Sequence, residues 1–238
     1  MATAAVYRLI RVGSETEGVF NTTMRTWVKS VLLRLYNTME AIAEADLPRF
    51  ANNPKNLKIE LPRRLFDTHR IYIGDDVSIG PGALLVPQTF YPSSVMCHPE
   101  KELDVQTFDP TITIGNRVTS TGMLTIAAMQ EVTIEDDVMF AANVLIADGM
   151  HGFENANEPY KYQKMCKIAP VVVKRGCWIG QNVVIMPGVT VGEMSIIGAN
   201  SVVTKSIPDR CIATGAPARV VKTWDERAQA WIPAGETR

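Results

Sequence analysis

The chain of 238 residues lacks an excess of charge, a long apolar run and a signal-peptide core. Its 24 Lys and Arg residues nearly balance 25 Asp and Glu residues, unlike the basic excess typical of nucleic-acid binders. No apolar run reaches the roughly 18 residues of a transmembrane helix, and no long apolar core precedes a cleavage site near the first residue. The sequence therefore predicts a cytoplasmic protein that binds no nucleic acid.

Cysteine and histidine are also scarce. The four cysteines contain no C-x-x-C pair, which predicts reduced thiols: Cys97, Cys166, Cys177 and Cys211. A zinc site built from histidine would need all three histidines of the chain, so no metal is predicted. No serine or cysteine stands in the context of a nucleophile.

Leucine is the third scarcity, with 13 residues against 43 of Ile and Val together. Branching at Cβ suits strands and disfavours helices, so an all-β fold is expected.

A six-residue period organises the middle of the chain. The aliphatic opening residue and a small or Val fifth residue are expected to point inward, and Gly, often second, is expected to permit the turn between flat faces. Three such units make one triangular coil, so fifteen units predict about five stacked coils. The units begin at Ile73, Ile79, Leu85, Ile114, Ser120, Ile126, Ile134, Phe140, Ile146, Val173, Ile179, Ile185, Val191, Ile197 and Val203.

Two breaks in the period, at residues 88–110 and 148–169, are predicted to be loops that leave the coil and carry function. This divides the chain into an N-terminal helical and capping region (1–70), a repeat domain (71–222) and a C-terminal tail (223–238).

Both ends of the chain are predicted to contain helices. Residues 22–46 are predicted to form a helix with one apolar stripe. We expect this helix to pack on the end of the coil, with a membrane-surface helix as the alternative. The stripe consists of Val28, Val31, Leu32, Leu35, Tyr36, Met39 and Ile42. Residues 223–231 are read as a second short helix, because Trp224 and Trp231 would lie two turns apart on one face.

The six-residue repeat, followed after its last unit by Gly-Ala-Pro-Ala-Arg at 215–219, resembles the hexapeptide-repeat acyltransferases, and the resemblance covers residues 71–222. This resemblance implies a left-handed parallel β-helix, although most parallel crossovers are right-handed. The segment from Asn143 to Phe153 is similar to the branch that O-acetylates sugars, including maltose, galactoside, O-antigen and capsule acetyltransferases. The O-antigen type usually reads Asp-His-x-His-Gly, and here Gly149 replaces the first His while His151 keeps the second.

The resemblance implies an acetyl-CoA-dependent O-acetyltransferase that acts on a hydroxyl of a sugar or polysaccharide precursor. His151 is the expected general base, because imidazole has a pKa near neutrality, and transfer from the thioester is direct. Asp148 is expected to orient the imidazole or bind the acceptor, with a turn-forming role as the alternative. Asn143 is expected to bind the acceptor or thioester, with an Asn ladder in the coil turns as the alternative.

Coenzyme A needs apolar walls for its pantetheine and cations for its phosphates. By resemblance, the binding residues are Trp178, Gln181, Ala199, Thr204, Lys205 and Arg219. The resemblance also implies a homotrimer with active sites between neighbouring coils.

The acceptor is expected under the second loop, and other readings stay open. The candidates for hydrogen bonds to a sugar are Glu154, Asn155, Asn157 and Tyr160, with His98 as a residue that approaches the same site. An amine acceptor, such as an amino sugar or small xenobiotic, would make the chain an N-acetyltransferase on the same fold. A γ-type carbonic anhydrase needs three closely patterned histidines that this chain does not offer, and a non-enzymatic β-helix would bind no CoA.

Overall fold

The computed structural model describes residues 22–93 and 95–235. The chain divides into two compact units, Met1–Asp46 and Leu47–Arg238. The described part of the first unit is helix α2 (Thr22–Ala45), which confirms the predicted N-terminal helix. Within the described residues, no helix combines the length and apolar character needed to cross a membrane.

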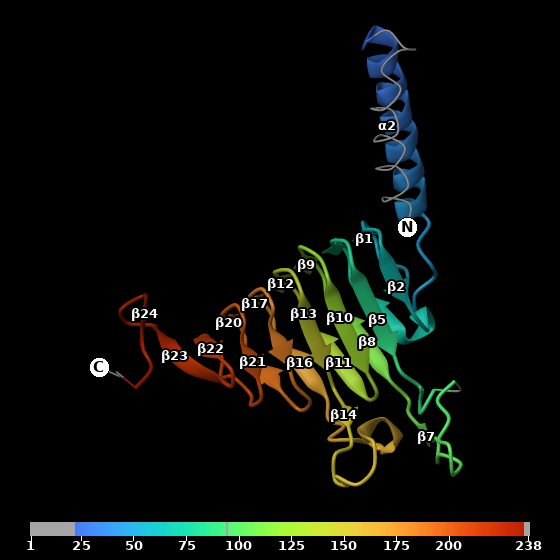
Figure 1. Ribbon diagram of the computed structural model, residues 1–238. Coiled ribbons are helices and arrows are strands. Elements are labelled where there is room, and N and C mark those ends of the chain that lie inside the picture. Colours follow the sequence, from blue (N-terminus) through green and yellow to red (C-terminus); the bar gives the residue numbers. More distant parts are fainter. Residues whose placement is uncertain (1–21, 94, 236–238) are drawn as a thin grey trace. The chain divides into compact units, whose positions relative to one another are not determined.

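The second unit is a parallel β-helix whose chain visits three sheets in turn (Figure 1). Sheet A consists of β1 (Lys58–Ile59), β4 (Ser78–Ile79), β9 (Thr119–Ser120), β12 (Met139–Phe140), β17 (Trp178–Ile179), β20 (Ile196–Ile197), β22 (Cys211–Gly215), β23 (Ala218–Asp225) and β24 (Ala230–Pro233). Sheet B consists of β2 (Arg63–Leu65), β5 (Ala83–Pro87), β10 (Leu124–Ala128), β13 (Val144–Ala147), β18 (Val184–Ile185) and β21 (Val202–Val203). Sheet C consists of β3 (Ile71–Ile73), β8 (Thr111–Ile114), β11 (Glu131–Ile134), β16 (Val171–Val173) and β19 (Thr190–Val191).

The six-residue period is confirmed by burial. All fifteen opening residues are buried, none more than 8% exposed, and so are the ten small or Val residues at the fifth position. Two opening residues are not Ile, Leu or Val, and they are direct neighbours in sheet A, where Ser120 pairs with Phe140. The small side chain leaves room for the large one, so the column remains filled despite both departures.

Glycine at the second position has a different reason from the one expected. At Gly180 the backbone is not in the left-handed region, but an added Cβ would lie 2.7 Å from the amide nitrogen of Ala199 on the next coil. The left-handed conformation falls later in the unit, on glycine in some units, such as Gly176 (φ 69°) and Gly188 (φ 76°), and on other residue types elsewhere, such as Asn182 (φ 58°) and Asp137 (φ 60°). Glycine at the second position therefore serves the close approach of stacked coils rather than the turn itself.

The β-helix begins before residue 71, which corrects the expected boundary. β1 pairs with β4 and β2 pairs with β5, so residues 58–65 already belong to the coil. The first coil is covered within the same unit, because Leu47, Phe50 and Leu57 pack against the aliphatic core.

The predicted C-terminal helix is wrong. β23 pairs antiparallel with β22 and with β24, so this segment is a hairpin that extends sheet A. Trp224 lies directly opposite Trp231, with ring centroids 5.4 Å apart in an edge-to-face contact. A spacing of seven residues suits two helical turns, but it equally suits a cross-strand pair joined by a short turn.

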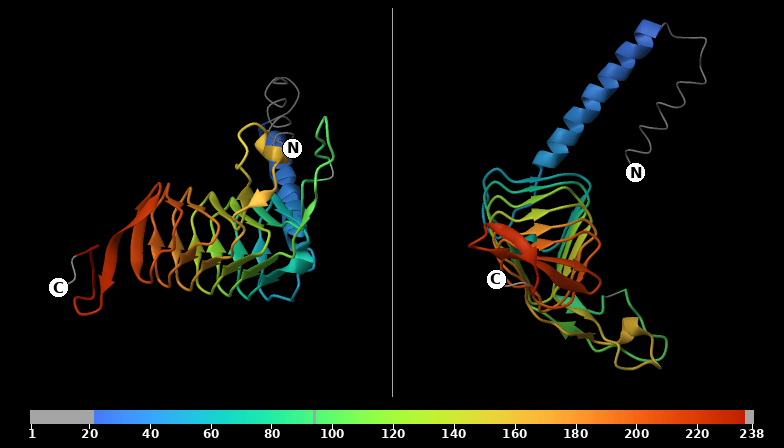
Figure 2. Two further views of the ribbon diagram at one scale, coloured as in Figure 1. Left: turned by 90° about the horizontal axis from the view of Figure 1, so that it is seen from below. Right: turned by 90° about the vertical axis from the view of Figure 1, so that its left-hand side faces the viewer.

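Both predicted loops leave the coil between sheets B and C, and Figure 2 shows them on the same side of it. The first insertion (residues 88–110) contains the antiparallel pair β6 (Phe90–Tyr91) and β7 (Gln106–Thr107). The second insertion (residues 148–169) contains the antiparallel pair β14 (Met150–His151) and β15 (Met165–Cys166), with a 3-10 turn at Tyr160–Tyr162. A further 3-10 turn, Thr68–Arg70, precedes β3.

Candidate active site

The two insertions pack against each other and form one structure outside the coil. The Gln106 side chain accepts a hydrogen bond from the Met165 amide (2.6 Å) and donates one to the Met165 carbonyl (3.2 Å). Lys101 and Glu158 add an ion pair at 2.5 Å. A small second core, separate from the coil core, lies beneath them and buries Tyr91, Met129 and Met165.

His151 lies on the strand β14, where this structure holds it from two sides. Its backbone pairs with Met165 across the hairpin, and its ring meets the Tyr91 ring edge-to-face at 5.2 Å. Tyr91 comes from the first insertion, is buried, and donates a hydrogen bond from its hydroxyl to the Lys161 carbonyl. Burial raises the pKa of the Tyr91 phenol. His151 itself is exposed, so its imidazole is accessible to a substrate while its ring and backbone are held by neighbouring residues.

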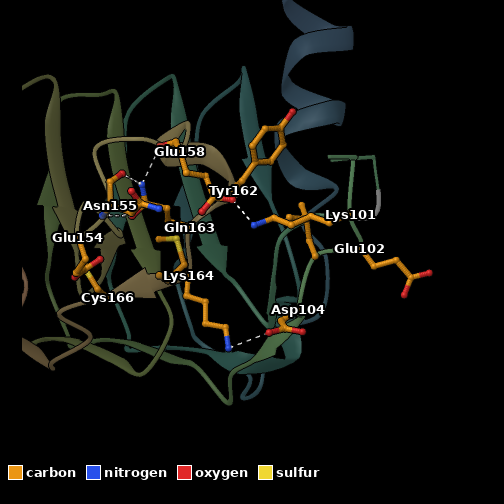
Figure 3. Close-up of a pocket in the computed structure, with 12 residues that line it drawn as sticks. Lys101, Glu102, Asp104, Glu154, Asn155, Glu158, Tyr162, Gln163, Lys164 and Cys166 are labelled. Atoms are coloured by element: carbon orange, nitrogen blue, oxygen red, sulfur yellow. Dashed lines mark hydrogen bonds and ion pairs between the residues drawn. The ribbon is translucent and has the colours of Figure 1, made fainter. Parts of the chain in front are cut away.

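A cavity of about 500 Å³ opens between the insertions, beside the same hairpin (Figure 3). It is lined by Lys101, Glu102, Leu103, Asp104, Glu154, Asn155, Glu158, Tyr162, Gln163, Lys164, Met165 and Cys166. Glu154 and Asn155 of the predicted acceptor loop are therefore lining residues, whereas Asn157 and Tyr160 are not.

The cavity wall is held by its own polar contacts. Gln163 is buried and donates to the carbonyls of Asn155 (2.6 Å) and Glu158 (3.0 Å). Burial, and then the Glu154 carboxylate, raise the pKa of the Cys166 thiol. Because a raised pKa disfavours the thiolate, which is the reactive form, Cys166 is not an activated nucleophile.

Asp148 does not meet the imidazole in the way the sequence suggested. Its carboxylate is fully buried and accepts three backbone N–H bonds at 2.7 Å, from Met129, Gln130 and Glu131 on the preceding coil. Its carbonyl accepts the Ala169 N–H at 2.8 Å, which closes the base of the second insertion. The geometry corrects the expected contact: the carboxylate fixes the root of the insertion, three residues before His151.

Asn143 is likewise part of the coil. It has a left-handed backbone (φ 60°) at the corner between sheets A and B and donates to Asn182 at 2.9 Å. Asn182 in turn donates to Asn200 at 2.9 Å, so the three side chains form an Asn ladder. Asn143 and His151 lie beyond opposite ends of β13, a strand of about 13 Å, so the structure does not bring them together within one chain.

The six residues expected to bind CoA are all exposed, but they fall into separate groups. Trp178 lies on β17, and Gln181 and Ala199 lie at the corner between sheets A and B. Thr204 and Lys205 follow β21, at the corner between sheets B and C, which is also where the insertions leave. Arg219 lies on β23, next to the last coil strand.

An exposed indole and two exposed cations match the chemistry of the cofactor. Trp178 presents an apolar surface that is 47% exposed. Arg219 donates to the Ala218 carbonyl, and neither it nor Lys205 forms an ion pair among the described residues. These side chains remain available for phosphate and pantetheine groups.

The other histidines have different surroundings. His98 accepts the Glu100 N–H at Nδ1 (3.0 Å), and its ring meets Tyr162, a lining residue of the cavity, at 4.5 Å. His69 is exposed on the turn before β3. Within residues 22–93 and 95–235, no group of three His, Cys, Asp or Glu side chains is arranged to hold a metal ion.

Sequence reasoning missed Tyr91, Gln106 and Gln163, which support the hairpin and the cavity. They lie in irregular insertions where no period marks a buried position. Only the aromatic content of the first insertion hinted at a packed role for Tyr91.

Comparison with known proteins gives one family match and several relatives. Residues 170–205 match the family model described as bacterial transferase hexapeptide (six repeats). The galactoside O-acetyltransferase of Escherichia coli is 40% identical over 116 residues, which cover 49% of this chain and 56% of the relative. The Schizosaccharomyces pombe protein named "Putative acetyltransferase C18B11.09c" is 30% identical over 171 residues, covering 68% and 78%.

A solved structure with the same fold is an N-acyltransferase from Bacillus cereus in complex with dTDP and coenzyme A. It aligns with a TM-score of 0.59 and 20% identity over 75% of this chain and 87% of that chain. Together with the family match, this confirms the expected left-handed parallel β-helix. A second Escherichia coli relative, named "Putative lipopolysaccharide biosynthesis O-acetyl transferase WbbJ", is 32% identical over 115 residues, which cover 46% of this chain. The chain spans less than two thirds of the length of these two relatives, 56% for the galactoside enzyme and 59% for WbbJ.

Proposed function

The chain belongs to the hexapeptide-repeat transferase family, and from this premise we propose that it is an acetyl-CoA-dependent O-acetyltransferase. Its acceptor is a hydroxyl of a sugar or of a polysaccharide precursor, as the name of the galactoside O-acetyltransferase suggests. His151 is the general base of the reaction.

One observation carries the proposal: the His151 imidazole is exposed while its ring and backbone are both supported. Tyr91 meets one side of the ring at 5.2 Å, and Met165 pairs with the backbone. The supports come from two insertions that are tied together, so the imidazole keeps its direction while remaining accessible. Such support is what a general base needs, because proton transfer depends on the base keeping its geometry.

In the proposed reaction, His151 takes the proton from the acceptor hydroxyl as the oxygen attacks the thioester carbonyl. The protonated imidazole then gives the proton to the departing thiolate of CoA. Because the acceptor oxygen attacks the thioester directly, no acyl-enzyme forms. His151 does not line the cavity between the insertions, but it pairs with Met165, which does. The acceptor is proposed to extend from this cavity, where Glu154 and Asn155 offer hydrogen-bond groups to sugar hydroxyls, to the exposed imidazole.

Acetyl-CoA supplies the activated acetyl group. Trp178, Gln181 and Ala199 offer a wall for the pantetheine, and Thr204, Lys205 and Arg219 offer donors and cations for the phosphates. Because these residues divide between two corners of the coil, we propose that the complete site forms between neighbouring copies in a homotrimer. In such a trimer, Asn143 of one copy is proposed to contribute to the site that contains His151 of an adjacent copy.

The proposal is tested by His151→Ala. Turnover of acetyl-CoA with a sugar acceptor is expected to fall about 10²- to 10⁴-fold, the usual contribution of a general base. Thiol release measures turnover, and calorimetry measures CoA binding, which is expected to persist. Lys205→Ala is expected to weaken CoA binding instead.

The matched control is His69→Ala, which removes another exposed imidazole outside both insertions. It is expected to retain turnover. Full turnover in His151→Ala would overturn the assigned base. A panel in which only amino sugars accept the acetyl group would replace O-acetylation by N-acetylation.

A further inference from the structure

Helix α2 carries a broad apolar face that is exposed among the described residues. Along this face lie Trp27, Val28, Leu32, Leu35, Met39 and Ile42, between 41 and 70% exposed. Their spacing follows the helical repeat, so they gather on one side. Large apolar side chains so exposed and so grouped mark an interaction surface rather than scattered surface residues.

The coil does not require this helix as a cap. Leu47, Phe50 and Leu57 already pack against the aliphatic core at its first coil. The Asn52 side chain donates to the Ile73 carbonyl (2.7 Å) and accepts the Ile73 N–H (3.0 Å), which satisfies backbone groups at the start of the coil. Residues 47–57 of the second unit therefore cover the first coil themselves.

The charge of the helix indicates what its apolar face meets. Helix α2 holds three cations, Arg25, Lys29 and Arg34, all in its first 13 residues, and two acidic residues, Glu40 and Glu44, in its last six. Lys29 and Arg34 are exposed on either side of the apolar face. An apolar face with Trp and Leu, flanked by cations, matches the interface of an anionic lipid bilayer.

A bundle of copies is the competing occupant, because Val28, Leu32, Leu35, Met39 and Ile42 also follow a spacing of 4, 3, 4 and 3 residues. Positions beside a coiled-coil seam usually carry pairs of opposite charge. Here the flanking positions hold Lys29, Val31, Tyr36 and Thr38, which offer one sign of charge only. A parallel bundle would therefore have no pair of opposite charge beside its seam at these positions.

We propose that helix α2 lies in the plane of an anionic membrane surface, with its apolar face among the acyl chains and its cations at the headgroups. The occupant is a lipid bilayer, and the interaction is reversible because one such helix gives modest affinity. The inference is independent of the proposed acetyl transfer.

The test is flotation of the full chain with vesicles of phosphatidylcholine, with and without phosphatidylglycerol. Binding is expected only with phosphatidylglycerol, and Lys29→Glu and Arg34→Glu are each expected to weaken it about fivefold or more, from roughly 1 kcal/mol per charge. Leu35→Asp, which puts a charge at the centre of the apolar face, is expected to weaken binding at least about tenfold.

The matched control is Leu33→Asp. Leu33 is as exposed as Leu35, 57 against 56%, but two residues turn it about 200° around the helix, away from the apolar face. It is expected to bind vesicles like the parent. Absence of vesicle binding by the parent, or equal binding by Leu33→Asp and Leu35→Asp, would overturn the proposal. A third outcome would also overturn it: the parent does not bind vesicles, and Leu35→Asp changes the oligomeric state measured by ultracentrifugation. The apolar face would then pack against a second copy of the chain.

Discussion

Asp148→Asn tests whether one buried carboxylate fixes the root of the second insertion. The substitution keeps the shape of the side chain but replaces one acceptor oxygen by an NH₂ group. Oδ1 accepts from Met129, whereas Oδ2 accepts from both Gln130 and Glu131, all at 2.7 Å. The amide is expected to turn so that its oxygen keeps the two donors at the Oδ2 position, while its NH₂ group takes the Oδ1 position and leaves the Met129 N–H without an acceptor.

The magnitude follows from these contacts. A hydrogen bond to a charged group contributes about 1.5–3 kcal/mol, and a buried donor left without a partner costs about 1–3 kcal/mol. One lost bond in a fully buried place, together with two bonds weakened by the loss of the charge, therefore predicts a decrease of about 2–4 kcal/mol in the free energy of unfolding. Few single substitutions exceed this range.

Urea unfolding at fixed protein concentration measures the effect as a lower midpoint. Hydrogen exchange of the amides of residues 129–131 locates it, because these groups are expected to exchange faster. Asp104→Asn is the matched control: Asp104 lies in the first insertion, is 84% exposed and pairs with Lys164 at 3.3 Å, a contact worth less than about 1 kcal/mol. A loss below about 0.5 kcal/mol in Asp148→Asn with unchanged exchange would refute the reasoning.

Two further predictions concern the Tyr91 ring beside His151 and the buried Cys177 thiol. Tyr91→Leu removes the edge contact to His151 and is expected to lower kcat on the order of tenfold with little change in KM for acetyl-CoA, whereas Tyr91→Phe keeps the ring and most of the rate. Equal rates of the two variants in steady-state assays would contradict a positioning role for Tyr91. Burial raises the pKa of Cys177 to about 11, so at pH 8 a maleimide is expected to label exposed Cys97 and to reach Cys177 only after unfolding, as peptide mapping would show. Labelling of native Cys177 at the rate of Cys97 would contradict this burial.

The coil was predictable because its period is local. A single unit shows which side chain points inward, and the units beginning at Ile73 and Val203 obey the same rule. The start of the coil was missed although Ile59 and Leu65 are also six residues apart, because that stretch lacks the glycine and small fifth residue of the other units. The C-terminal hairpin was missed because Trp224 and Trp231 fit either a helix or a cross-strand pair.

The candidate site was predictable only in part. The order of the repeat located the insertions and the place of His151 within them, and the residue type suggested its chemistry. The partners of Asp148 lie 17 to 19 residues earlier, and stacking of two coils brings them together. Tyr91 and His151 are separated in the sequence by two whole coils and parts of both insertions, so no spacing in the sequence connects their rings.

The insertions leave the register of the coil unchanged. On either side of the first one, Leu85 pairs with Ile126 and Ile73 with Ile114, as if no residues had been added. The second one also leaves Ile134 paired with Val173. The length of these segments is thus independent of the register of the aliphatic column, and Asp148 is the point where the second insertion is tied to the coil. If the insertions hold the acceptor, as proposed, acceptor preference can diverge among descendants of one scaffold, and be exchanged by grafting beyond Asp148, without rebuilding the interior.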